Sequence, residues 1–277
     1  MVTSGELVRL FERDFAAAGI ETPAADALRL VAEITGIPEL ETELAPEHTV
    51  DGETELRLRE LARRRCRREP LQYLTGKAFF RDLELAVSPA VLIPRPETEL
   101  LADHLLASAP EGGRVLDLGT GSGAIAIAAA VERPDLVVTA ADISPDALET
   151  ARMNAEKYAA DIRFVKSDLF SALGNETFDF VAANLPYVTE TEYETLQPEV
   201  KDHEPRLALT APDDGFDIIA RAAAELPRRL TPGGRAAFEL SPPQALRLVM
   251  LLKGLGLAAY VARDLAGRDR FVFAEKI

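Results

Sequence analysis

The chain has 277 residues, with 31 basic and 46 acidic side chains, which gives a formal net charge of −15. Its 47% hydrophobic and 28% charged residues are ordinary for a globular protein and exclude disordered, collagen-like and membrane-embedded chains. The acidic balance argues against a protein that binds by neutralising many phosphates, since that requires basic surface. It does not exclude a small nucleotide ligand. At roughly 150 residues per domain, the length predicts one large domain or a domain with a smaller partner.

The cysteine and histidine content gives no sign of a metal centre. Cys66 is the single cysteine, and the three histidines lie far apart in the sequence. The charged N-terminal segment lacks the apolar core of a signal peptide. The longest alanine-rich apolar run, residues 124–131, is much shorter than the roughly 20 residues that span a bilayer. We therefore expect a cytoplasmic protein with no metal and no membrane partner.

Residues 1–77 have the pattern of a small helical domain. Apolar residues recur at helical spacing, as in Leu7, Leu10 and Phe11. Thr22 and Pro23 resemble an N-cap followed by proline in the first helical position. Five arginines lie between residues 63 and 68. They fit either a solvated helix end, where cations favour the helix dipole, or a contact surface for an acidic partner.

Residues 78–96 alternate apolar and polar side chains around a Ser88-Pro89 turn, which predicts a β-hairpin linker. From residue 97 to 277, strand and helix patterns alternate. Ser144 is expected to cap one helix, and Gly254 to end the last helix. This alternation predicts an open, mostly parallel α/β sheet with helices on both faces, and ligands in such sheets bind at the carboxyl ends of the strands. The expected helices are 97–108, 124–132, 145–159, 217–230 and 244–253, and the expected strands are 114–118, 136–141, 162–165, 178–183, 235–240, 258–263 and 270–274.

A glycine-rich turn follows the first of these strands. Glycines at alternate positions allow a tight turn and a close approach to a ligand, although an ordinary strand–helix turn remains the alternative. Asp142, about 20 residues further on at the end of the second strand, is placed to bind both ribose hydroxyls. Asp117 suits an ammonium group better than a pyrophosphate, which it would repel. A ribose with a cationic amino-acid tail is S-adenosylmethionine. The turn is Asp117-Leu118-Gly119-Thr120-Gly121-Ser122-Gly123.

This arrangement resembles the cofactor half of the class I methyltransferases. In that class an acidic residue after the third strand commonly meets the adenine amine, and Asp168 has this place here. Leu169 is expected to face the ligand, whereas Phe170 fits either the ligand or the core.

The fourth strand ends in Asn184-Leu185-Pro186-Tyr187. This resembles the (Asp/Asn)-Pro-Pro-(aromatic) motif of methyltransferases that act on a nitrogen conjugated to a π system. The Asn184 side-chain oxygen and the Leu185 carbonyl can hold the two N–H bonds of such a nitrogen. Tyr187 can pack its ring on the flat acceptor. Leu185 replaces the first proline, which preserves the carbonyl and removes some stiffness from the loop. A plain strand-ending turn is the alternative.

Further segments resemble the release factor glutamine methyltransferases (the PrmC/HemK family) in the same order and spacing. The motif Glu-Ile-Gly-x-x-Gln of that family is altered here at residues 239–244. The prolines of segment 94–98 fit either a border of the active site or a rigid linker turn. The matching segments are 69–76, 91–99, 204–209 and 264–270.

The resemblance implies an α/β fold: a Rossmann-like, seven-stranded class I methyltransferase sheet at 97–277, with a helical recognition domain at 1–77 joined by the hairpin. It implies transfer of a methyl group from S-adenosylmethionine to the N5 nitrogen of the glutamine in the Gly-Gly-Gln motif of class I peptide chain release factors, with S-adenosylhomocysteine as product. Residues 119–123, Asp142, Leu169 and Asn184 would bind the cofactor, and residues 184–187 the glutamine. We expect direct in-line transfer by a monomer.

Three other functions remain open at this point. An adenine-N6 nucleic-acid methyltransferase shares the acceptor motif, but the −15 charge argues against it. Asp117 beside the glycines argues against an NAD enzyme. The nearly complete acceptor motif argues against a binding module that reuses the cofactor fold.

Overall fold

The computed structural model describes residues 2–212 and 214–277. These residues form two compact units. The first contains the chain up to Lys77 together with Gln197–His203, and the second contains Ala78–Leu196 and Glu204–Ile277. A short segment of the C-terminal part of the chain is therefore built into the N-terminal unit.

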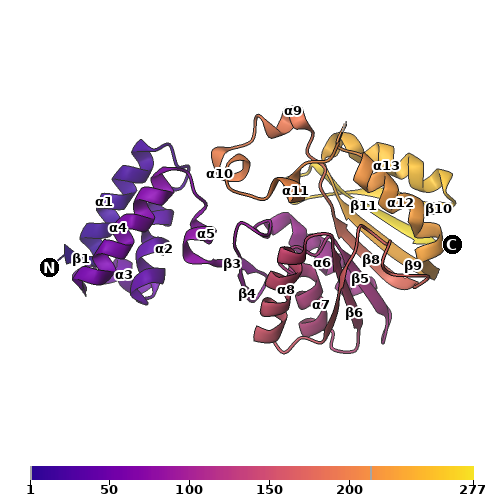
Figure 1. Ribbon diagram of the computed structural model, residues 1–277, viewed down its shortest axis with the longest axis horizontal. Coiled ribbons are helices and arrows are strands. Elements are labelled where there is room, and N and C mark those ends of the chain that lie inside the picture. The colour runs from indigo at the N-terminus through magenta and orange to yellow at the C-terminus, as the bar shows by residue number, and fades with distance from the viewer. Residues whose placement is uncertain (1, 213) are drawn as a thin grey trace. The chain divides into compact units, whose positions relative to one another are not determined.

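The first unit is helical, as the apolar spacing predicted (Figure 1, indigo to purple). Leu7, Phe11 and Phe15 line one face of helix α1 and pack into a core with residues from α2 and α4. Thr22 is the N-cap of α2, but its hydroxyl donates to the Asp26 carboxylate and accepts no backbone N–H. The helices are α1 (Ser4–Ala17), α2 (Pro23–Thr35), α3 (Glu39–Leu44), α4 (Gly52–Cys66), α5 (Leu71–Thr75) and α10 (Pro198–Lys201), and strands β1 (Val2–Thr3) and β2 (Thr49–Val50) pair antiparallel.

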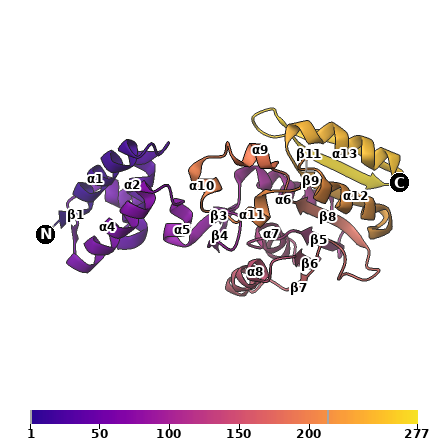
Figure 2. The same cartoon turned by 45° about the horizontal axis from the view of Figure 1, so that its top comes forward.

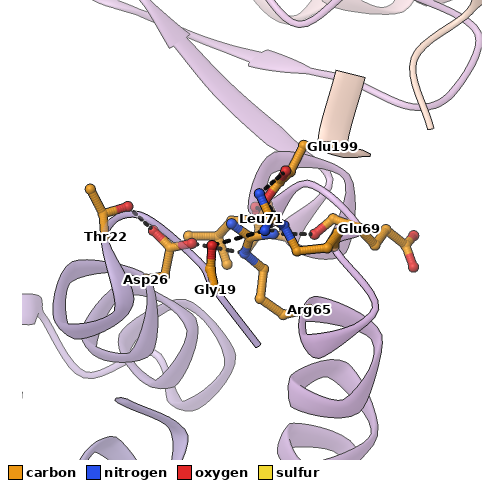
Figure 3. A network of polar contacts seen from close by, with 9 residues as sticks. Gly19, Thr22, Asp26, Arg65, Glu69, Leu71 and Glu199 are labelled. Carbon is orange, nitrogen blue, oxygen red and sulfur yellow. Dashed lines mark hydrogen bonds and ion pairs between the residues drawn. The ribbon is translucent and has the colours of Figure 1, made fainter. Parts of the chain in front are cut away.

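Two arginines of the run at the end of α4, Arg65 and Arg68, are engaged inside this unit, so the solvated helix end, the first of the two interpretations, does not hold for them. Arg65 is 6% exposed, and it donates to Asp26 at 2.8 Å and to Glu199 at 3.0 Å. Arg68 donates twice to the same Glu199 carboxylate, at 2.6 Å each. Figure 3 shows Arg65 between Asp26 and Glu199. Arg65 and Arg68 thus share an acidic partner in the chain's own segment 197–203, and these ionic contacts hold that segment to the helices.

The second unit contains the predicted seven-stranded sheet, in the order β10-β11-β9-β8-β5-β6-β7. All strands run parallel except β11, which is antiparallel to both of its neighbours. The chain order reverses between β5 and β8, which is where α/β sheets bind ligands. The strands are β5 (Arg114–Leu118), β6 (Val137–Asp142), β7 (Ile162–Lys166), β8 (Phe178–Asn184), β9 (Leu230–Glu239), β10 (Leu257–Arg263) and β11 (Asp269–Lys276).

Helices cover both faces of this sheet (Figures 1 and 2). α12 (Asp217–Arg229) and α13 (Pro242–Gly254) pack on one face, and α6 (Pro96–Ser108) and α7 (Ala124–Glu132) on the other, each over its own apolar core. The remaining elements of the unit are α8 (Pro145–Lys157) and the short helices α9 (Glu190–Tyr193) and α11 (Arg206–Leu209). The predicted hairpin is formed by β3 (Lys77–Phe80), which begins at the last residue of the first unit's N-terminal part, and β4 (Leu83–Ala86). Its turn lies at residues 81–82 and not, as predicted, at Ser88-Pro89.

Most element boundaries agree with the sequence patterns within a few residues, and Ser144 caps α8 as predicted. The expected cap at Gly254 was wrong, because Gly254 is still helical. The glycine with the left-handed backbone there is Gly256, at φ +83°. β9 also begins earlier than predicted, at Leu230.

Candidate active site

A cavity of about 260 Å³ opens at the carboxyl ends of the central parallel strands, within the second unit. It is lined by the segments that follow β5, β6, β7 and β8, and by the segment that leads into α6. These are the strand ends at which the sequence predicted a ligand. The lining segments are residues 90–98, 118–125, 141–147, 167–169, 184–186, 205–208 and 218–221, with some positions in them not exposed to the cavity.

The glycine-rich turn is fixed to the neighbouring strand by its own backbone. The N–H groups of Gly119 and Thr120 donate to the carbonyl of Ala141 at 2.8 and 3.1 Å. Gly119 has φ +79°, and an added Cβ would lie 3.0 Å from Cδ2 of Leu185. Glycine is required here both for the backbone conformation and for the close approach of the acceptor loop.

Asp142 links this turn to the end of β6. Its carboxylate accepts from the N–H of Gly121 and from the N–H of Ser144, each at 2.9 Å. Burial raises the pKa of Asp142, and these backbone hydrogen bonds oppose the shift. Each oxygen keeps a further lone pair that can accept from a ligand hydroxyl, which fits a ribose diol.

Asp117 lies behind the turn and does not line the cavity. One oxygen accepts from the Thr120 hydroxyl at 2.6 Å and from the N–H of Ala126 at 3.1 Å. The other oxygen is buried and has no hydrogen-bond partner among the described residues. Burial raises the pKa of Asp117 to about 7. A cationic ligand group in the cavity would favour the ionised form through its charge.

Gly123, another expected cofactor residue, also lies outside the cavity lining. It is the N-cap of α7 with φ +85°, and an added Cβ would lie 2.9 Å from Cδ1 of Ile127. Its role in the structure is helix packing, whereas Thr120, Gly121 and Ser122 line the cavity as predicted.

The segment after β7 forms another part of the cavity wall. Leu169 lines it, whereas Phe170 is 1% exposed and belongs to the core, which settles the alternative left open for Phe170. Leu169 has φ +49°, and the Ser167 hydroxyl donates to its carbonyl at 2.6 Å. Asp168 also lines the cavity, but it is paired with Arg221 at 2.7 Å. A ligand amine there would share the carboxylate with Arg221.

The predicted acceptor motif follows β8, and Asn184, Leu185 and Pro186 line the cavity. Tyr187 does not line it. Its hydroxyl accepts from Arg270 at 3.4 Å, and burial raises its pKa to about 12. The packing of the Tyr187 ring against an acceptor group stays a prediction.

In the altered family motif at residues 239–244, the side chain of Gln244 joins three backbone segments by hydrogen bonds. Gln244 Nε2 donates to the carbonyls of Tyr187 and Gly215, at 3.0 Å each, and its Oε1 accepts from the N–H of Ser241. The loop after β8 is held through this glutamine.

The sequence placed Thr98 and Glu239 in matching segments but did not reveal that they connect to the acceptor motif. Asn184 Nδ2 donates to the Thr98 hydroxyl at 3.1 Å, and that hydroxyl donates to Glu239 at 2.7 Å. Thr98 and Glu239 are 6% and 3% exposed. The signals were a polar residue in the segment 94–98 and a carboxylate at the end of a parallel strand.

The segment 94–98 borders the cavity, which agrees with its interpretation as a border of the site. Glu204 holds it there: its carboxylate accepts from Arg95 at 2.5 Å and from the N–H of Ile93 at 3.2 Å. Among the described lining residues, Arg95 and Arg221 are the cations, and each is paired with a carboxylate.

Residues 2–212 and 214–277 contain no group of three or more His, Cys, Asp or Glu side chains placed to hold a metal ion. No helix in the same ranges has the length and apolar character needed to cross a membrane.

Comparison with known proteins gives consistent matches in both parts of the chain. Residues 6–76 match the PrmC N-terminal domain model, and residues 96–207 match the Methyltransferase small domain model. The chain is 38% identical over 261 residues to the release factor glutamine methyltransferase of Deinococcus radiodurans, covering 94% of this chain and 93% of that protein. It is 46% identical over 198 residues to that of Koribacter versatilis, covering 70% and 71%.

Among solved structures, a methyltransferase from Pyrococcus furiosus matches with a TM-score of 0.55 at 22% identity, covering 71% of this chain and 91% of that one. A T. thermophilus 16S rRNA methyltransferase in complex with AdoMet and guanosine matches with a TM-score of 0.54 at 22% identity, covering 73% and 50%. At this identity the two structures show the fold, which is that of a methyltransferase.

Proposed function

Because this chain belongs to the release factor glutamine methyltransferase family, we propose that it methylates the N5 nitrogen of the glutamine in the Gly-Gly-Gln motif of class I peptide chain release factors. S-adenosylmethionine is the methyl donor. The observation that carries the proposal is the position of Asn184 and Leu185: they line the same cavity as the glycine-rich turn and Asp142. An amide acceptor and a nucleotide-like donor can meet there.

The cavity fits S-adenosylmethionine in three respects. Asp142 has acceptor capacity for the ribose hydroxyls, and the glycine-rich turn leaves its backbone accessible to the ligand. Asp117 lies behind the turn, and its negative charge would favour the ammonium of the amino-acid tail without direct contact. Leu169 would cover the adenine, and Asp168 would accept from its amine. When bound, this cofactor supplies an electrophilic sulfonium methyl group.

The acceptor loop has to make a poor nucleophile reactive. The nitrogen of a glutamine amide is conjugated to its carbonyl, so its lone pair attacks weakly. The Asn184 side-chain oxygen and the Leu185 carbonyl would accept its two N–H bonds, direct the lone pair at the methyl carbon and stabilise the positive charge that grows on nitrogen. The nitrogen–carbon bond forms as the carbon–sulfur bond breaks, and the nitrogen then loses a proton to water.

The helical first unit is the proposed recognition domain for the release factor. Most of its arginine run is committed to internal ion pairs with Glu69, Asp26 and Glu199, so we assign recognition to the unit's other surfaces. We place the reaction in the cytoplasm, where peptide chain release factors act.

The test offers methyl-labelled S-adenosylmethionine to the purified protein with three acceptors. These are a class I release factor, the same factor with Gly-Gly-Gln changed to Gly-Gly-Ala, and double-stranded DNA. The proposal predicts label on the first acceptor only. Equal labelling of the alanine version would contradict glutamine as the target, and label on DNA would support the adenine-N6 alternative.

A further inference from the structure

We propose that Thr98 and Glu239 are positioning residues that fix the orientation of the Asn184 carboxamide, so that its oxygen faces the acceptor site. The inference rests on the proposed function and assigns a task to two side chains outside the Asn184–Tyr187 motif. Both act through Asn184 and not on the substrate itself.

The three side chains come from separate elements of the second unit. Thr98 lies in the first turn of α6, Asn184 ends β8 and Glu239 ends β9. Asn184 and Glu239 are paired in the parallel register of β8 and β9, which places them side by side at the carboxyl edge of the sheet. Thr98 hydrogen-bonds to both, at 3.1 and 2.7 Å.

The number of protons in this chain of contacts decides the orientation. A threonine hydroxyl has one hydrogen, and an ionised carboxylate can only accept. In the structure the Thr98 hydroxyl donates its hydrogen to Glu239, as an ionised Glu239 requires, and the Thr98 oxygen is left as an acceptor. Asn184 meets that oxygen with its NH₂ group. With the amide turned over, two oxygens would face each other with no hydrogen between them.

Burial is the largest influence on Glu239 and raises its pKa, and the negative charge of Glu97 acts in the same direction. The Thr98 hydrogen bond and the positive charges of Arg270 and Arg95 oppose this shift. Both Thr98 and Glu239 are buried, so water competes little for their hydrogen bonds. The arrangement is thus preorganised before any substrate arrives.

The orientation matters because the reacting glutamine nitrogen presents only donors to the loop. An Asn184 oxygen that faces the cavity accepts a hydrogen bond from this nitrogen, whereas an NH₂ group at the same place would set two donors against each other. Loss of the orientation should therefore lower the rate of methyl transfer and leave the cofactor's contacts with Asp142 and the glycine-rich turn intact.

The test compares Thr98→Val, which removes the hydroxyl at nearly constant volume, with Thr98→Ser, which retains it. Thr139→Val is the matched control: Thr139 is a 3% exposed threonine in β6, in the sheet that contains Asn184 and Glu239, and its hydroxyl accepts from Arg163. We expect Thr98→Val to reduce kcat at least about 10-fold, with KM for the release factor and cofactor affinity within about twofold of the unmodified protein. The serine variant and the control should retain kcat within about threefold.

Glu239→Gln provides a second, nearly isosteric variant in case the valine variant is poorly folded. A glutamine amide can donate to Thr98 and so allow the chain of hydrogen bonds to reverse; kcat should fall as in Thr98→Val. Unchanged kcat in both variants would overturn the inference, and so would an equal loss in Thr139→Val. If the unmodified protein does not methylate release factor at all, the proposed function fails. The inference is then judged by the Asn184 NH₂ resonances in NMR spectra, which should lose protection from hydrogen exchange in Thr98→Val and keep it in Thr98→Ser; equal protection in both would overturn it.

Discussion

Asp117 offers a test of the cofactor site in which stability and binding change in opposite directions. Burial raises the pKa of this carboxyl from 3.8 to about 7, so between these values the folded protein holds a proton that the unfolded chain has lost. Stability must then fall as pH rises through this window and level off above it. The shift is about 3 pKa units, and at 1.36 kcal/mol per unit it amounts to about 4 kcal/mol across the window and about 3 kcal/mol between pH 5 and pH 8.

Asp117→Asn removes this titration. The free energy of unfolding of the variant, relative to that of the unmodified apoprotein, should therefore rise by about 3 kcal/mol between pH 5 and pH 8. Urea unfolding at both pH values measures the difference. The same variant should bind S-adenosylmethionine more weakly, because the negative charge behind the turn that favours the ammonium is lost. Asp135→Asn is the control, since Arg133 holds the pKa of Asp135 well below its usual range, outside the measured window. If the free energies of unfolding of Asp117→Asn and of the unmodified protein change equally between pH 5 and pH 8, Asp117 does not titrate there and the reasoning fails.

Three further substitutions test other parts of the structure. Asn184→Ala should lower methyl transfer by about 100- to 1,000-fold while isothermal titration still detects cofactor binding; near-normal turnover would remove Asn184 from its role. Glu199→Gln should destabilise the helical unit by about 1–3 kcal/mol, because a buried arginine loses a charged partner; hydrogen exchange measures this, and Glu60→Gln, at an exposed ion pair, should have little effect. Gly119→Ala should destabilise more than Gly112→Ala in thermal unfolding: both glycines have positive φ, but only at the former would the added Cβ meet a leucine methyl, at 3.0 Å. Equal losses would show that backbone strain alone matters.

The sheet and the cavity could be predicted because their signals are local. Each parallel strand is a short apolar run followed by polar residues at its carboxyl end, and parallel strands bring those ends to one edge. Gly119, Asp142 and Asn184 come from three different strand ends, and the fold rule alone predicts that they lie near each other.

The contacts that the sequence did not reveal join residues far apart in the chain. Thr98 and Glu239 are 141 positions apart, and they meet because α6 brings Thr98 to the end of β9. Arg65 looked like part of a solvated helix end because its partner Glu199 is 134 positions away. Tyr187 follows the motif in sequence, but its side chain turns to Arg270, whose position depends on the antiparallel strand β11. No local pattern carries these pairings.

The central claim is that this cavity transfers a methyl group to one glutamine side chain. The most direct measurement is tandem mass spectrometry of a class I release factor after incubation with the protein and S-adenosylmethionine. A single methyl group located on the side-chain amide of the Gly-Gly-Gln glutamine, absent when Asn184→Ala replaces the unmodified protein, is the result predicted here. A methyl group on any other residue, or an unmodified Gly-Gly-Gln peptide after reaction with an enzyme shown to bind the cofactor, would contradict it.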